Sequence, residues 1–234
     1  MIFIFFSLRR SRVNSFIIQK ILFMEIFRLV FSPIEVNTYI LADESGDCAI
    51  IDCGCYGTNE SEELEVFISD KNLNPVLLLN THCHLDHIFG NKFILDKYKL
   101  KTFCGKGDEK NMKDAEQHSR IFGLTMEEPP AAEGFISDNQ VFAFGTTELK
   151  ALHVPGHSPG SFAFYSEQNG SVFTGDALFS GSIGRTDLPG GDYGLLINSI
   201  NTKLFVLPPA IVVYPGHGKE TTIEREKLSN PFFA

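Results

Sequence analysis

The chain has 234 residues, 43% of them hydrophobic, which is enough to bury a substantial core within one domain. Its formal net charge of −9 argues against nucleic acid as a general partner, because binding to phosphates requires a basic surface. The five cysteines are an odd number and form no Cys-x-x-Cys pair, which is typical of a reducing, cytoplasmic protein.

Residues 1–23 differ from the rest of the chain because they are basic and contain no acidic residue. Their apolar cluster at 2–6 precedes the basic residues, the reverse of the order in a secretory signal. No run approaches the roughly 18 apolar residues of a membrane span, so we expect no stable membrane insertion. We predict that residues 1–23 are an extension outside the domain and that residues 24–234 form the domain, with Met24 as an alternative start. A targeting or membrane-surface helix is the alternative interpretation of the extension.

Strand-like and helix-like runs alternate from residue 25 onward. Apolar or alternating runs predict strands at residues 25–31, 36–42, 48–52, 76–80, 101–104, 141–144, 149–153, 162–165, 171–174 and 210–214. Amphipathic runs predict helices at residues 60–70, 87–99, 106–123, 192–205 and 222–228. Asn59 is the predicted N-cap of the first helix, and the Pro- and Glu-rich residues 127–134 predict a loop over the functional site. This alternation of many strands with a few helices is compatible with two sheets packed between layers of helices.

Residues 81–87 read Thr-His-Cys-His-Leu-Asp-His and follow the strand predicted at 76–80. In extended backbone, residues i and i+2 point to the same side, so His82 and His84 can reach one metal ion together. Asp86 and His87 lie where a helix begins, and the turn aims them at a neighbouring position. One run can therefore serve two metal ions. Cys83 points away from the two histidines, and we interpret it as a packing residue, with thiolate ligation as the alternative.

Two metal sites need further ligands, and the remaining histidines are few. His157 and His217 each follow Pro-Gly after a strand-like run, and Asp176 follows Thr-Gly at a strand end. These three residues therefore share the local setting of the first motif. We interpret His153 as a packing or supporting residue and His118, in a charged helical stretch, as a solvated surface histidine.

The ordered set His-x-His-x-Asp-His, Pro-Gly-His, Thr-Gly-Asp and Pro-Gly-His resembles the metallo-β-lactamase superfamily. Residues 175–192 and 218–232 are similar to short-form members of its glyoxalase II-like (hydroxyacylglutathione hydrolase-like) branch, and the resemblance covers residues 25–233. It implies an α/β fold of the αββα sandwich type. Long-form enzymes of this branch bind glutathione through a helical C-terminal region, and here only the short segment 218–234 follows His217.

The resemblance also implies a site with two divalent metal ions, Zn²⁺ by our interpretation, with Fe or Mn as alternatives. One ion is implied at His82, His84 and His157, and the second at Asp86, His87 and His217. Asp176 is implied as the ligand that both ions share. Asp52 matches an aspartate that steadies the metal cluster from behind, and a surface turn aspartate is the alternative.

The function that the resemblance implies is a metal-dependent hydrolase that cleaves thioesters of the hydroxyacylglutathione type with a metal-bound hydroxide. Asp86 is the implied catalytic residue, which orients this nucleophile. A thiolate can leave without protonation by a strong general acid. A thioester therefore fits a sequence that shows no obvious general acid beside the metal ligands. Arg185 is expected to bind a carboxylate of the small-molecule thioester substrate, and a structural salt bridge is equally compatible with its position.

Three other functions remain open from the sequence. The first is a mononuclear iron persulfide dioxygenase that uses His82, His157 and Asp176. The second is a β-lactamase or phosphodiesterase. The third is a non-catalytic domain stabilised by metal, although structural sites have no use for a carboxylate shared between two ions.

Overall fold

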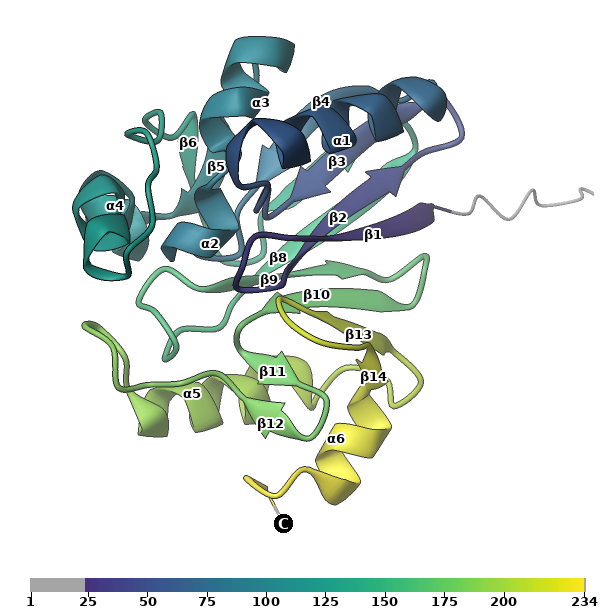
Figure 1. Cartoon of the computed structure of the whole chain (residues 1–234). Coiled ribbons are helices and arrows are strands. Elements are labelled where there is room, and N and C mark those ends of the chain that lie inside the picture. The colour runs from purple at the N-terminus through teal and green to yellow at the C-terminus, as the bar shows by residue number, and fades with distance from the viewer. Residues whose placement is uncertain (1–23, 234) are drawn as a thin grey trace, which may run out of the picture.

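Two six-stranded sheets pack face to face between layers of helices in the computed structural model, which describes residues 24–233 (Figure 1). This is the αββα sandwich expected from the sequence. The extension predicted at residues 1–23 lies outside the described residues. Within the described part of the chain, no helix combines the length and the apolar character needed to cross a membrane.

The first sheet has the order β1-β2-β3-β4-β5-β6. Its strands are β1 (Glu25–Phe31), β2 (Val36–Ala42), β3 (Asp47–Ile51), β4 (Asn74–Leu79), β5 (Thr102–Gly105) and β6 (Gly134–Ile136). The pairs from β1 to β3 are antiparallel, and those from β3 to β6 are parallel. The carboxyl ends of the parallel strands therefore share one edge of the sheet, where the loop after β4 begins.

The second sheet has the order β14-β13-β10-β9-β8-β7. Its strands are β7 (Val141–Phe144), β8 (Thr147–His153), β9 (Phe162–Ser166), β10 (Ser171–Gly175), β13 (Val212–Pro215) and β14 (Thr221–Thr222). A separate short hairpin consists of β11 (Leu178–Phe179) and β12 (Ser182–Ile183). Because β10 and β13 are parallel neighbours, the residues that follow them meet at one edge.

The helices cover the outer faces of both sheets (Figure 1). They are α1 (Gly57–Asp70), α2 (Leu85–Ile88), α3 (Asn91–Tyr98), α4 (Glu109–Ile121), α5 (Tyr193–Ser199) and α6 (Ile223–Ser229). The main core lies between the sheets, where Phe164 and Phe173 are fully buried. Burial of each such ring contributes roughly 1.5–3 kcal/mol. Three further apolar clusters lie around Leu64 of α1, around Leu196 of α5, and around Met112 of α4.

The N-cap prediction for the first helix is wrong. The helix begins at Gly57, so Asn59 lies within its first turn, and the N-cap residue Tyr56 makes no side-chain cap. The Glu60 carboxylate accepts hydrogen bonds from the backbone N–H groups of Tyr56, at 2.6 Å, and Ser32, at 2.9 Å. An acidic side chain in the first turn also interacts favourably with the helix dipole. The helix start is thus stabilised from within and by the β1–β2 turn.

The single helix predicted at residues 87–99 is two helices, because the chain breaks at Gly90. The Gly90 N–H donates to the Cys53 carbonyl at 2.8 Å. A Cβ at this position would collide with the sulfur atoms of both Cys53 and Cys55. This close approach ends α2 after one turn, and α2 therefore carries only Asp86 and His87 from the metal motif.

Other element boundaries shift by a few residues. The helix predicted at 106–123 is a 3-10 turn followed by α4, and the one at 192–205 is α5 followed by a π-helical turn. The short strands β6, β11, β12 and β14 were absent from the prediction because two or three residues carry too little periodicity.

Candidate metal centre

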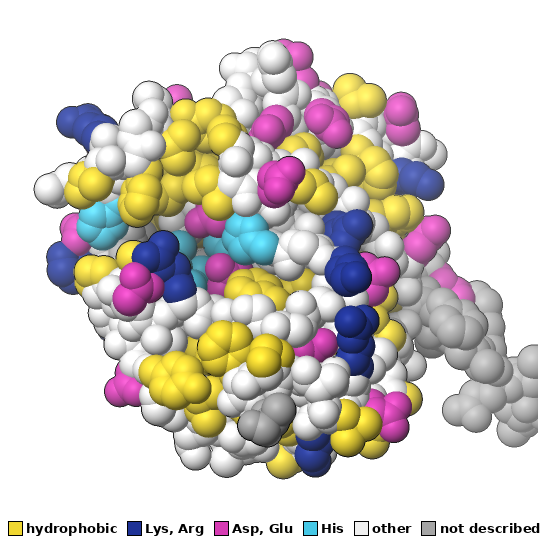
Figure 2. Space-filling model, turned by 60° about the horizontal axis from the view of Figure 1, so that its bottom comes forward, with side chains coloured by type: hydrophobic (Ala, Val, Ile, Leu, Met, Phe, Trp, Pro, Cys, Tyr) yellow, Lys and Arg dark blue, Asp and Glu magenta, His cyan; other side chains and the backbone are white. Residues whose placement is uncertain are grey.

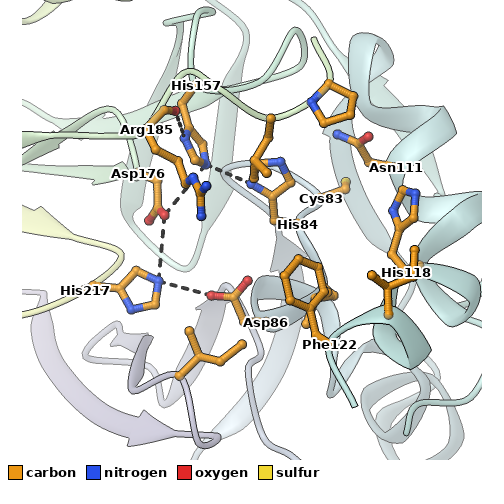
Figure 3. A pocket seen from close by; sticks show the side chains of 16 residues that line it. Cys83, His84, Asp86, Asn111, His118, Phe122, His157, Asp176, Arg185 and His217 are labelled. Atoms are coloured by element: carbon orange, nitrogen blue, oxygen red, sulfur yellow. Dashed lines mark hydrogen bonds and ion pairs between the residues drawn. The ribbon is translucent and has the colours of Figure 1, made fainter. Parts of the chain in front are cut away.

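Seven side chains from four loops meet at one edge of the sandwich. Four of them follow β4, and single residues follow β8, β10 and β13. They are His82, His84, Asp86, His87, His157, Asp176 and His217, which we call the metal centre residues. Figure 3 shows five of them at the base of a cavity. The structure thus brings together all seven residues that the sequence analysis selected, while their role as ligands stays a prediction.

Six of the seven residues form two groups of three. In the first, His84 Nδ1 lies 2.8 Å from His157 Nε2, which lies 3.1 Å from His82 Nε2. In the second, Asp86 Oδ2 lies 3.1 Å from His217 Nε2 and 3.6 Å from His87 Nε2. Each group brings three ligand atoms within 4.8 Å of one another, which is compatible with one metal ion.

Asp176 lies between the two groups. Its Oδ1 is 3.3 Å from His87 Nε2, and its Oδ2 is 3.7 Å from both His157 Nε2 and His217 Nε2. One carboxylate therefore contacts histidines of both groups. This position allows Asp176 to bridge two ions.

The outer nitrogen of four histidines contacts a hydrogen-bond acceptor. Carbonyl and carboxylate oxygens can only accept, so Nδ1 carries a proton, and in the neutral ring Nε2 presents a lone pair to the centre. The contacts are His87 Nδ1 with Asp52 Oδ2 at 2.9 Å, His157 Nδ1 with the Arg185 carbonyl at 2.8 Å, and His217 Nδ1 with the Glu35 carbonyl at 3.1 Å. His82 Nδ1 lies 3.1 Å from Thr81 Oγ1, which donates its own proton to Asp52 at 2.6 Å.

This arrangement of donors fits a pair of divalent cations. Lone pairs of imidazole nitrogens that face one another at about 3 Å repel unless a cation lies between them. His87 Nε2 and Asp176 Oδ1 are buried and lie 3.3 Å apart, but neither forms a hydrogen bond with any of the described residues, and such atoms are rare in folded proteins. Imidazole and carboxylate ligands suit zinc, iron and manganese.

The electrostatics of the site also favour cation binding. Burial and the neighbouring His157 lower the pKa of His84 to about 4, so its ring is neutral near pH 7. Burial lowers the pKa of His87, but Asp86, Asp176 and Asp52 outweigh it and leave the pKa well above its ordinary value. The same carboxylates that favour a proton at His87 Nε2 favour a metal ion there.

Asp52 is a buried residue behind the centre and not a surface turn aspartate, with 1% of its surface exposed. Its backbone has φ = 54°, a left-handed conformation that costs a residue with a side chain on the order of 1–3 kcal/mol. Its Oδ1 accepts the Thr81 N–H at 2.7 Å, while Oδ2 contacts Thr81 Oγ1 and His87. The strained conformation directs the carboxylate to the metal motif.

Asp108 is a functional candidate that the sequence analysis missed. It is fully buried, and its Oδ2 accepts hydrogen bonds from the Cys83 N–H at 2.9 Å and from Ser158 Oγ at 2.7 Å. Its Oδ1 accepts the Gly160 N–H at 2.8 Å. Asp108 therefore ties the loop that carries His84 to the loop that follows His157. The charged sequence around it resembles an ordinary surface helix and gives no signal of this role.

A cavity of about 540 Å³ opens over the metal centre. One wall is a single face of α4 and its end, with Asn111, Ala115, His118 and Phe122. Figure 3 shows Asn111, His118 and Phe122 on the side opposite Arg185. His118 is thus a half-buried residue of the cavity wall, a role that the prediction of a solvated surface histidine did not include, and the spacing 111, 115, 118, 122 is the helical signal that could have indicated this face. The loop predicted at residues 127–134 is present up to the start of β6, but none of its residues lines the cavity, so its predicted position over the site is wrong.

Arg185 lines the cavity, but its guanidinium binds Asp187 through two hydrogen bonds of 2.7 Å. The structure thus contains the salt bridge that was the alternative interpretation. Cys83 is buried beside Cys104 and Met112, as a packing residue would be. His153 lies 3.1 Å from the Pro159 carbonyl, in agreement with a supporting role.

A model of the metallo-beta-lactamase superfamily matches residues 32–217. The chain is 36% identical over 216 residues to hydroxyacylglutathione hydrolase GloC of Haemophilus influenzae, with 89% of this chain and 98% of that protein covered. Among solved structures, BLEG-1 B3 metallo-beta-lactamase is 32% identical with a TM-score of 0.83 and coverage of 90% and 100%. TTHA1623 in a di-iron-bound form is 34% identical with a TM-score of 0.80 and coverage of 88% and 99%.

Proposed function

The chain belongs to the metallo-β-lactamase superfamily and is a metal-dependent hydrolase, and from this premise we propose that it hydrolyses thioesters of the hydroxyacylglutathione type. The convergence of the seven metal centre residues at the base of one cavity carries the proposal. The similarity to GloC of Haemophilus influenzae supports the choice of thioesters over other acyl compounds.

In this proposal, His82, His84 and His157 hold one divalent ion, Asp86, His87 and His217 hold the second, and Asp176 is shared. When bound, such a pair lowers the pKa of a coordinated water to about 7 and stabilises negative charge that develops on an acyl carbonyl. Zinc is the metal we propose. Iron and manganese suit the same ligands, and the di-iron form of TTHA1623 makes iron the first alternative to test.

The protein's own residues position the reactants. The Asp86 carboxylate lies beside His217 and lines the cavity, where it can accept a hydrogen bond from the attacking water and orient it. Asp52 and the backbone carbonyls of Glu35 and Arg185 hold the histidine rings in place. A carboxylate of the substrate would have to compete with Asp187 for Arg185.

The leaving group argues for a thioester. Among the described residues that line the cavity, Asp86 and Asp176 are the only carboxylic acids, and both belong to the metal centre. No further carboxylic acid is therefore present to protonate a poor leaving group. A thiolate is stable enough to leave unprotonated at neutral pH, since thiols have a pKa near 8.5.

The test combines elemental analysis with a substrate panel. We expect about two metal ions per chain and thiol release from S-lactoylglutathione or simpler thioesters. Nitrocefin, bis(nitrophenyl)phosphate and oxygen uptake with glutathione persulfide complete the panel. A metal-loaded protein that releases no thiol from any thioester would contradict the proposal, and oxygen uptake with one iron per chain would replace it with the dioxygenase.

A further inference from the structure

Away from the metal centre, the cavity is lined mainly by hydrocarbon. Ile34 of the β1–β2 turn and Ile121 and Phe122 at the end of α4 are 42%, 73% and 60% exposed. Figure 2 shows hydrophobic side chains along the hollow in which the histidines lie. Large apolar side chains left this exposed beside a reactive centre are typical of a binding surface.

The wall of the cavity carries little positive charge. Among the described residues that line the cavity, Arg185 is the only lysine or arginine. Its Nε and Nη2 groups each donate a hydrogen bond to the Asp187 carboxylate. The wall thus presents mainly apolar side chains, which suit an uncharged acyl group.

The cavity has a closed side and an open side. Cys83 and Ala115, each 1% exposed, close it next to His84, where they belong to a buried cluster with Met112. Leu188 and Pro189 line the side near Arg185, which is exposed. The thiol is the first product to leave, so its half of the substrate belongs on the open side. The acyl half then lies along α4, from the closed side at Ala115 toward the exposed Ile121 and Phe122 at the end of the helix.

We propose that Ile34, Ile121 and Phe122 form an acyl-binding wall, and that the substrates are thioesters of apolar, uncharged acyl groups. This inference rests on the proposed thioester hydrolysis. In that reaction, a water oxygen forms a bond to the carbonyl carbon, and the C–S bond breaks with its electron pair on sulfur. One proton of the water ends on the departing thiolate and the other is released to solvent, so the products are a carboxylate and a thiol. The wall contributes by removing the acyl chain from water as the substrate binds.

The test varies the acyl chain and the thiol separately. Acetyl, butanoyl and hexanoyl thioesters of the neutral thiol N-acetylcysteamine are compared with the same acyl groups and lactoyl on glutathione. We expect kcat/KM to rise about ten-fold from acetyl to hexanoyl on either thiol, since a partly open wall buries only part of each methylene. Non-hydrolysable ketone analogues, with CH₂ in place of sulfur, should bind in the same order by calorimetry.

Two variants locate the effect. The double variant Ile121→Ala/Phe122→Ala should reduce the acetyl-to-hexanoyl preference to within about two-fold, mainly by lowering kcat/KM for the hexanoyl ester. Leu228→Ala, at a residue 76% exposed on α6 and outside the cavity, is the matched control and should retain the preference.

The outcomes separate this inference from the proposed function. Equal rates for all acyl chains, or a preference that survives in the double variant, would overturn the acyl-binding wall and leave thioester hydrolysis intact. Chain-length-dependent binding of the ketones without hydrolysis of any thioester would overturn the proposed function and support the wall.

Discussion

The carboxylate of Asp52 lies 2.9 Å from Nδ1 of His87, and both side chains are buried. This contact joins the end of β3 to the one-turn helix α2, which lies 35 positions further along the chain. It fixes which nitrogen of His87 carries the proton and therefore which nitrogen faces the metal centre. The local strain at Asp52 is retained because the same carboxylate also binds the backbone and hydroxyl of Thr81.

Asp52→Ala should weaken metal binding without unfolding the protein. Loss of an outer partner of a metal-bound histidine typically costs about 10- to 100-fold in metal affinity. Metal content after competition with a chelator measures the effect, and Asp70→Asn, at an exposed residue at the end of α1, is the control. An Asp52→Ala protein that retains wild-type metal affinity would mean that Asp52 serves only its hydrogen bonds with Asn80 and Thr81.

Asp176→Ala should abolish turnover and lower the metal content. Asp176 is the carboxylate that contacts His157, His217 and His87, so its removal deprives both groups of a ligand. Elemental analysis should show fewer than two ions per chain, and thiol release should fall to the background rate. Asp176→Asn keeps the shape of the side chain and removes its charge, so its metal content and its rate of thiol release should lie between those of the wild type and those of Asp176→Ala. Little change in metal content would show that the bridging role is misassigned.

Asp108→Asn should lower both stability and metal affinity. The carboxylate accepts three hydrogen bonds from the loops around His84 and His157, and an amide cannot accept at its nitrogen. A buried donor left unsatisfied costs about 1–3 kcal/mol. Urea unfolding of the chelator-treated protein measures the first effect, and metal titration measures the second. If stability falls while metal affinity is unchanged, Asp108 stabilises the loops without positioning the ligands.

The parts of the fold that were predictable from the sequence are those with strong local patterns. Strands β1, β2 and β7 have the predicted bounds because each has a clear apolar or alternating run. The seven metal centre residues were selectable because His and Asp are chemically distinctive and stand at strand ends beside glycines. Each of these signals lies within about ten residues of chain.

The features that escaped prediction depend on contacts between distant segments. The break at Gly90 arises from the sulfur atoms of Cys53 and Cys55, more than thirty residues earlier. The role of Asp108 depends on the loop around Ser158, and the place of His118 depends on which face of α4 turns toward the cavity. A pattern in one segment cannot specify what packs against it.

Asp43 gives a pH-dependent prediction far from the metal centre. Its carboxylate links the turn after β2 to the β7–β8 hairpin, with acceptor contacts to Thr146 N–H, Thr146 Oγ1 and Thr147 Oγ1 between 2.9 and 3.1 Å. Burial raises its pKa, but the hydrogen bonds from Ser45 and Thr146 outweigh burial and leave the pKa well below its ordinary value of 3.8. The ionised form is therefore preferred in the folded protein.

Asp43→Asn should therefore destabilise the protein near neutral pH by about 1–3 kcal/mol, because the partly buried donors of Thr146 and the buried hydroxyl of Thr147 lose a charged acceptor. Because the pKa is lower in the folded than in the unfolded state, the wild-type carboxylate contributes fully above about pH 5 and loses its contribution as the pH falls below 3.8. Urea unfolding of both proteins between pH 7 and pH 3 measures the difference, in which effects of pH on the metal centre cancel. A difference that stays constant as the pH falls would show that the charge of Asp43 is not what stabilises the link between the two sheets.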